Sequence, residues 1–336
     1  MTEGYCIDLD CGSGGLAYAL ARQSNLRIVA LGADPDRAAE ARRRFDKAGL
    51  YGTRVTLLAV DDPRSLPDYL GDLVVCGRSV EGAMPALRGE VQRILRPFGG
   101  AACFGRLGAM ETATRGPLAG AGDWTHQYCD PANSNCSTDT LLSGRLGVLW
   151  FNDLAFPAPS RHGRGRAPLY FNGRLFIQGL DGLLCVNAYN GRKLWEYPLP
   201  GIQQVFDGEH LLGTSGTGSN YCVGPAGLYI HTGKECLRID PASGALVGRL
   251  PAPDQPDGSP GTWGIVALSG NTLFGTLADT RHLVTCRGQL PGPAGGLVLM
   301  PDATDRCTCS YLNKASIALG PLGPRPPGTA PHGASR

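Results

Sequence analysis

Hydrophobic and polar positions follow two different rhythms along this chain, and the first covers residues 5–104. Short apolar runs there alternate with segments in which apolar residues recur every three or four positions. The runs predict strands and the periodic segments predict helices. The expected strands span residues 5–9, 26–31, 55–60, 73–76 and 101–104, and the expected helices span 16–22, 35–48 and 85–95. This alternation predicts a mixed fold that begins with an α/β Rossmann-like domain, residues 1–110, built on a parallel sheet.

Helical periodicity nearly vanishes after a connector at residues 111–144. Short β-type runs are separated by dipeptides that favour hairpin turns. These dipeptides are Asn172-Gly173, Asp181-Gly182, Asn190-Gly191, Ser243-Gly244 and Ser269-Gly270. The pattern predicts an all-β region over residues 145–319. The Pro- and Gly-rich tail, residues 320–336, is predicted to be disordered.

An internal repeat lies within the all-β region. The turn glycines Gly191 and Gly244 are 53 residues apart, and the pairs Leu149-Trp150 and Leu194-Trp195 are 45 apart. Such periods are typical of four-stranded propeller blades, so the region holds about three to four blades. A complete ring typically has about 4–8 blades. We therefore expect an incomplete propeller whose open edges favour self-association.

Charge and composition narrow the classes of partner. A net charge of +2 with 18% charged residues gives no reason to expect nucleic acid or a membrane surface as a partner. No apolar run approaches the ~20 residues of a membrane span. The stretch from Met1 to Cys6 lacks a basic region followed by an apolar core, so we expect no signal peptide in this chain.

A glycine-rich loop follows the first expected strand. Its sequence, Asp8-Leu9-Asp10-Cys11-Gly12-Ser13-Gly14-Gly15, resembles the first cofactor loop of class I S-adenosylmethionine (SAM) methyltransferases. The resemblance implies SAM as the cofactor, with Asp8, Asp10, Gly12 and Gly14 at the loop. It also places Asp61 near the adenine.

Three departures from that family argue against SAM binding and catalysis. Asp10 stands where the first loop glycine is usual, and Gly32 stands where an acid usually holds the ribose. Asp34 is two residues further on, so on an extended chain it faces the same side and substitutes for that acid. The family's last β-hairpin is missing after Phe104. We expect a degenerate methyltransferase-like domain.

The second part resembles quinoprotein (PQQ)-type β-propeller repeats. Taken whole, the chain is similar to planctomycete proteins in which a methyltransferase-like domain precedes such a propeller. The supporting segments are Asp123-Trp124-Thr125-His126-Gln127-Tyr128, Arg161-His162-Gly163-Arg164-Gly165 and Cys307-Thr308-Cys309-Ser310-Tyr311. The resemblance implies an extracytoplasmic, periplasmic location. The PQQ cofactor does not carry over, because the chain has no adjacent Cys-Cys pair, and we interpret Trp150 and Trp195 as blade-packing residues.

Cysteines and histidines suggest a disulfide rather than a metal. Cys286, Cys307 and Cys309 lie among loop residues, and a disulfide between Cys286 and either of the others is predicted. His126, Cys129 and Cys136 match no zinc spacing, so no metal site is expected.

Two functions remain open at this point. The first is a binding or scaffold protein whose propeller surface holds a protein or glycan ligand. The alternative is an active SAM-dependent methyltransferase whose propeller recruits the substrate.

Overall fold

The computed structural model consists of two compact units, Met1–Leu118 and Ala119–Arg336. It describes residues 1–60, 62–81, 88–106, 108–152, 166–202, 204–206, 210–212, 220–277, 292–294, 297–300 and 316–321. Residues of the expected connector, 111–144, pair with both units. Its start belongs to the first sheet, and Trp124, further along it, pairs with Tyr170 in the second unit.

The first unit contains a six-stranded sheet in the order β3-β2-β1-β4-β5-β6. Its strands are β1 (Glu3–Asp8), β2 (Asn25–Leu31), β3 (Val55–Leu58), β4 (Leu73–Val75), β5 (Ala101–Arg106) and β6 (Ala109–Thr114). Its helices are α1 (Gly15–Gln23), α2 (Pro35–Lys47) and α3 (Arg88–Ile94), with short 3-10 turns η1 (Pro63–Ser65) and η2 (Gly77–Glu81). The first five strands are parallel, and the order reverses between β1 and β4. The expected α/β alternation is confirmed.

A β-hairpin does follow Phe104, so the prediction that it is missing was wrong. β6 pairs antiparallel with β5 from Ala101↔Thr114 to Arg106↔Ala109. All six residues of β6 are exposed. A strand that buries neither face has no hydrophobic alternation, and the sequence therefore carried no signal for it.

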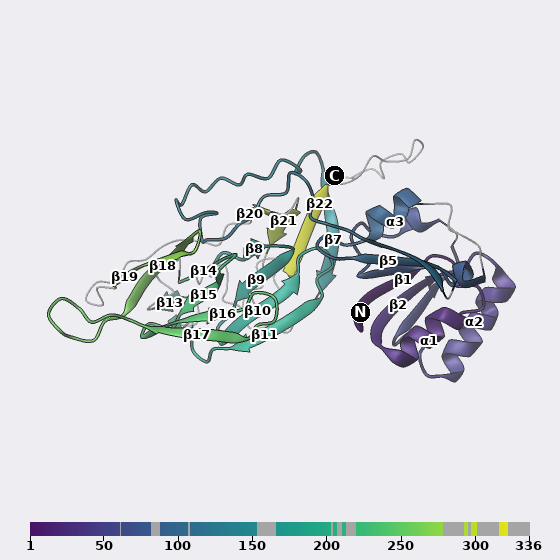
Figure 1. Ribbon diagram of the computed structural model, residues 1–336, viewed down its shortest axis with the longest axis horizontal. Helices are drawn as coiled ribbons and strands as arrows, with labels where there is room; N and C mark the ends of the chain where they lie inside the picture. Colours follow the sequence, from purple (N-terminus) through teal and green to yellow (C-terminus); the bar gives the residue numbers. More distant parts are fainter. Residues whose placement is uncertain are drawn as a thin grey trace, which may run out of the picture. The chain divides into compact units, whose positions relative to one another are not determined.

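The sheet of the first unit is covered on both faces, as Figure 1 shows, with α1 and α2 on one side and α3 on the other. Ile28 and Phe45 belong to the core between the sheet and the first two helices. Ile7 and Ile94 belong to the core on the α3 side. Coverage of both faces is why the parallel strands read as continuous apolar runs.

The second unit consists of antiparallel sheets. Two are four-stranded meanders, ordered β11-β10-β9-β8 and β14-β15-β16-β17. Two hairpins, β12-β13 and β18-β19, and a sheet ordered β20-β21-β22-β7 complete the described strands. Their bounds are β7 (Leu146–Asn152), β8 (Leu169–Phe171), β9 (Arg174–Gln178), β10 (Gly182–Asn187), β11 (Lys193–Pro198), β12 (Gln204–Phe206), β13 (His210–Leu212), β14 (Tyr221–Gly224), β15 (Gly227–His231), β16 (Glu235–Ile239), β17 (Leu246–Pro251), β18 (Trp263–Ser269), β19 (Thr272–Leu277), β20 (Gly292–Ala294), β21 (Leu297–Met300) and β22 (Ser316–Pro321).

First strands of successive sheets lie side by side in this unit, because β14 contacts both β8 and β18. The five expected turn dipeptides all fall at hairpin turns between neighbouring strands. β7 pairs with β22, so strands from the two ends of the unit share one sheet. This pairing differs from the expected open run of blades, in which the strand at each end would be unpaired.

The repeat has a specific packing motif. The indole Nε1 of Trp150, on β7, donates to the Ala188 carbonyl at 2.9 Å, and its ring lies over Gly191 in the next sheet. Trp195, on β11, donates to the Pro241 carbonyl at 3.1 Å and lies over Gly244. Each tryptophan therefore packs on the glycine turn of the following sheet.

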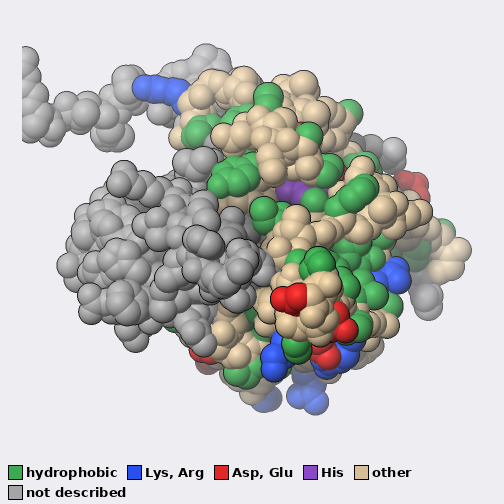
Figure 2. Space-filling view, turned by 90° about the vertical axis from the view of Figure 1, so that its left-hand side faces the viewer, with side chains coloured by type: hydrophobic (Ala, Val, Ile, Leu, Met, Phe, Trp, Pro, Cys, Tyr) green, Lys and Arg blue, Asp and Glu red, His purple; other side chains and the backbone are tan. Residues whose placement is uncertain are grey.

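Outer strands of the second unit leave large apolar side chains in solvent. Val148 and Phe151 on β7 are each 65% exposed, and Phe274 on β19 is 56% exposed. Figure 2 shows the second unit from the side of β18 and β19, where hydrophobic and uncharged atoms cover most of the described surface. Of the helices that the structure describes, none is long and apolar enough to cross a membrane.

Candidate functional site

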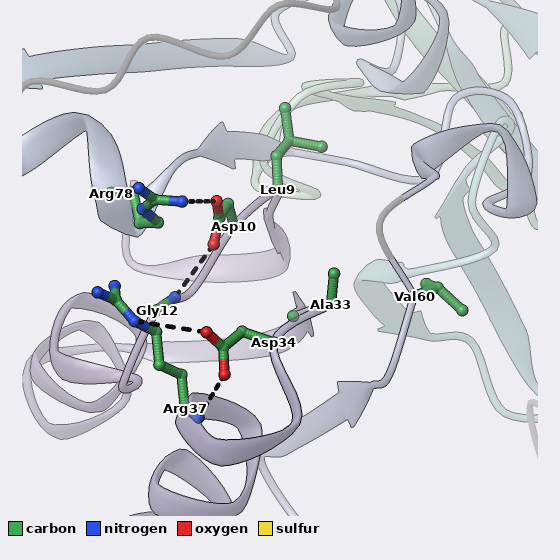
Figure 3. Close-up of a pocket in the computed structure, with 9 residues that line it drawn as sticks. Leu9, Asp10, Gly12, Ala33, Asp34, Arg37, Val60 and Arg78 are labelled. Carbon is green, nitrogen blue, oxygen red and sulfur yellow. Dashed lines mark hydrogen bonds and ion pairs between the residues drawn. The ribbon is translucent and has the colours of Figure 1, made fainter.

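A cavity of about 310 Å³ opens in the first unit where β1 and β2 end. Its walls are Leu9, Asp10, Gly12, Gly32, Ala33, Asp34, Arg37, Val60 and Arg78 (Figure 3). In open parallel sheets, ligands bind beyond the carboxyl ends of the strands, where the strand order reverses. The cavity is at that place, beside the β1–β4 reversal.

The loop from β1 to α1 depends on two glycines with left-handed backbone, Gly12 (φ +52°) and Gly14 (φ +78°). A Cβ on Gly14 would lie 2.6 Å from Cζ of Phe45, so only glycine allows α1 to pack against α2 here. α1 has no side-chain cap and no acidic residue in its first turn. Its first amide groups are therefore suited to an anionic group of a ligand.

Asp10 lies in the cavity wall and is balanced by an arginine. Its Oδ1 accepts from the Gly12 amide at 3.4 Å, and its Oδ2 lies 3.4 Å from Nη1 of Arg78 in η2. Its φ is not left-handed, so a side chain at this position causes no backbone strain. The two side chains are 43% and 44% exposed, and such exposed pairs contribute little stability. The carboxylate therefore stays where a ligand would approach the loop.

Asp34, not position 32, carries the carboxylate in the opposite wall. Its Oδ1 accepts from the amides of Asp36 (3.0 Å) and Arg37 (3.1 Å), which caps α2. A Cβ on Gly32 would lie 3.3 Å from Sγ of the buried Cys11. The side chain of an acid at position 32 would therefore be packed against Cys11 at its Cβ, whereas the Asp34 side chain lines the cavity.

Asp8 is buried behind the loop rather than in the wall. Its Oδ1 accepts from the Gly77 amide at 2.7 Å, and its Oδ2 has no hydrogen-bond partner. Burial, with a smaller contribution from the charge of Asp10, raises the pKa of Asp8 to about 6. Asp8 therefore ties the end of β1 to the segment after β4. Asp61 and the cysteines Cys286, Cys307 and Cys309 lie outside the described residues.

Two wall residues, Arg37 and Arg78, were not predicted from the sequence. Arg37 is one of several arginines on the amphipathic α2, and nothing in the periodicity distinguishes it. Arg78 comes three residues after β4 ends at Val75. Its place beyond the carboxyl end of a parallel strand next to β1 is the signal that could have identified it.

His126, in the second unit, has two protein partners. Its Nδ1 lies 2.7 Å from the Thr125 hydroxyl, and its Nε2 accepts from the Leu268 amide at 2.9 Å. Burial lowers the pKa of His126 to about 4. This neutral imidazole links the segment before β7 to β18, which is a structural role.

Neither the family models nor the curated proteins contain a match to this chain. Solved structures do match. A proposed SAM-dependent methyltransferase of Methanococcus maripaludis is 31% identical, covering 31% of this chain and 48% of its own (TM-score 0.28). A SAM-dependent methyltransferase of Aquifex aeolicus is 18% identical over 30% of this chain and 56% of its own (TM-score 0.27). A proposed sarcosine dimethylglycine methyltransferase of Galdieria sulphuraria is 20% identical over 31% and 39% (TM-score 0.26).

The matched part of this chain thus spans about half or less of the length of most of these proteins. With TM-scores this low, the assignment of the first unit to the doubly wound α/β class rests on its own strand order. Over about a third of its length, the chain is similar to SAM-dependent methyltransferases.

Proposed function

We propose that this chain is a binding protein whose first unit holds SAM weakly and does not transfer its methyl group. The observation that carries the proposal is the Asp10 carboxylate in the cavity wall, held between the Gly12 amide and Arg78. The ligand's own carboxylate would approach this loop and the N-terminus of α1.

Asp10 weakens that approach by like-charge repulsion. Two unit charges about 4 Å apart repel by about 1 kcal/mol in water and about 4 kcal/mol near a protein surface. Asp10 is half exposed and Arg78 offsets part of its charge, so we take about 1–2 kcal/mol. This corresponds to a loss of affinity of roughly five- to thirtyfold.

For the second unit we propose a PQQ-like β-propeller that serves as a binding surface for a protein or glycan, without PQQ. Its support is the adjacency of first strands and the repeated packing of Trp150 on Gly191 and Trp195 on Gly244. We also propose an extracytoplasmic location, because the resemblance to PQQ-type propeller proteins implies it.

The alternative is an active methyltransferase, and one observation favours it. Asp34 stands in the cavity wall at the end of β2, where a carboxylate can accept hydrogen bonds from ribose hydroxyls. In that case the second unit recruits the substrate.

Calorimetric titration with SAM decides between the two. We expect the full chain to bind SAM at about ten micromolar or weaker, and Asp10→Gly to bind at least fivefold more tightly. Asp10→Asn separates charge from bulk, and Asp36→Asn, exposed on α2 and outside the wall, is the control. Low-micromolar binding by the unmodified chain, or an Asp10→Gly variant without effect, would replace this proposal with the enzyme.

A further inference from the structure

One short segment of the second unit contacts strands of three different sheets. Atoms of residues 124–126 form hydrogen bonds of 2.7–3.0 Å with Tyr170 on β8, Val223 on β14 and Leu268 on β18. Each of these strands is the first of its sheet. The position of residues 124–126 therefore affects how three sheets are held together.

The chain turns back directly after this segment. The Thr125 amide donates to the Cys129 carbonyl at 2.8 Å, and the Cys129 amide donates to the His126 carbonyl at 3.1 Å. Left-handed backbone recurs along the next residues, with φ of +82° at Cys129, +56° at Asn133 and +54° at Asn135. Left-handed residues turn the chain sharply, so the loop that follows the segment is compact.

Two cysteines meet at the base of this loop. The Asn135 amide donates to the Tyr128 carbonyl at 3.0 Å, so the residues that follow them, Cys136 and Cys129, lie close together. The Cys129 thiol donates to the Cys136 carbonyl at 3.2 Å. Burial, then the charge of Asp130 and that of a Cys136 thiolate, raise the pKa of Cys129 to about 11. Cys129 is buried and Cys136 is exposed, so rotation of the Cys136 side chain is the main movement that a bond between the two sulfurs requires.

We propose that Cys129 and Cys136 form a disulfide, which makes this loop a redox site that fixes the segment joining the three sheets. The bond closes residues 129–136 into a ring. A cross-link stabilises a fold mainly by lowering the entropy of the unfolded chain, and the native loop already holds the two cysteines together. The proposal depends neither on SAM binding nor on a ligand of the second unit.

The bond forms by thiol–disulfide exchange with a small disulfide such as oxidised glutathione. The exposed Cys136, as a thiolate, attacks one glutathione sulfur and releases one glutathione thiolate. The Cys129 thiolate then attacks Sγ of Cys136, forms the Sγ–Sγ bond and releases the second glutathione thiolate. The two thiol protons go to these thiolates, so the chain loses two electrons and glutathione gains them. Disulfides persist in oxidising compartments, and the proposed extracytoplasmic location is one.

The test incubates the full native chain with oxidised and reduced glutathione and then blocks the remaining thiols by alkylation. Cleavage before each aspartate separates the two cysteines and yields peptides 123–129 and 130–138. We expect mass spectrometry without reductant to find these two peptides linked. At a given glutathione ratio, the link should form at least tenfold more readily in the native chain than in the urea-unfolded chain, because only the native loop holds the two cysteines together.

Urea unfolding followed by tryptophan fluorescence gives a second readout. Through this bridge, oxidation should raise the urea midpoint of the second unit by about 1 M. Cys136→Ser should lose that part of the shift and keep only what other cysteines contribute. Cys103→Ser, half-buried on β5 of the first unit, is the matched control and should keep the full shift. Absence of the linked peptides from the native chain, equal linkage in the native and unfolded chains, or a full shift in Cys136→Ser would overturn the proposal.

Discussion

Substitution of Gly191 by alanine tests whether tryptophan packing between sheets holds the second unit together. Gly191 has φ +69°, a left-handed conformation that costs alanine about 1–2 kcal/mol. A Cβ there would lie 2.5 Å from Cε3 of Trp150, so the indole must move. The move breaks the Nε1 hydrogen bond to Ala188, worth about 1 kcal/mol, and disturbs a side chain that is only 8% exposed. With about 1–3 kcal/mol for overpacking, the total is about 3–6 kcal/mol.

Gly201→Ala is the matched control. Gly201 has φ +68°, nearly the same backbone, but a Cβ there would meet nothing within 4 Å. It should cost only the conformational part, about 1–2 kcal/mol. Gly244→Ala, with φ +75° and Trp195 at 2.7 Å, should behave like Gly191→Ala because it is the same contact in the next repeat.

Urea unfolding followed by tryptophan fluorescence measures these differences. All four tryptophans lie after residue 118, so their emission reports the second unit alone. We expect Gly191→Ala to lose about 2–4 kcal/mol more than Gly201→Ala, which shifts the urea midpoint by about 1–2 M. Equal losses for the two variants would show that the indole contact adds nothing, and the packing argument would fail.

Three further predictions concern titration and oxidation. Because the pKa of buried His126 is lowered from 6.5 to about 4, the second unit should keep full stability above pH 6.5 and lose up to about 3 kcal/mol as the pH falls to 4. A flat urea-midpoint profile over that range would contradict this. Since the pKa of Asp8 is raised from 3.8 to about 6, ionisation of the folded protein costs stability as the pH rises through that interval. Asp8→Asn should then stabilise the first unit at about pH 7.5 by up to about 3 kcal/mol, and by nothing below pH 3.8, as followed by circular dichroism. The third prediction is a disulfide between Cys286 and either Cys307 or Cys309. Mass spectrometry of non-reduced digests should find this one bridge. Alkylation of all three cysteines without reductant would exclude it.

Local pattern in the sequence determined most elements of both units. The strand at 26–31 and the helix at 35–48 appear as β2 (Asn25–Leu31) and α2 (Pro35–Lys47), because burial of one face leaves a fixed period in the chain. The spacing of Trp150, Trp195 and the turn glycines likewise predicted the repeat that the packing contacts express. The β5–β6 hairpin escaped prediction because a strand exposed throughout leaves no such period.

Contacts between distant residues were decided only by the tertiary structure. Arg78 reaches Asp10 across 68 positions of sequence, and no local property of either residue pairs them. The Tyr221 hydroxyl reaches the Ala167 carbonyl, 54 positions away, only because β14 packs against β8. The residues next to a side chain in the sequence determine its backbone conformation and the face of the strand or helix on which it lies. The charges and hydrogen-bonding groups around it depend on which other strand end the fold brings beside it. The sequence thus identified where a site could form, and the packing of separate strands determined which charges and polar atoms fill it.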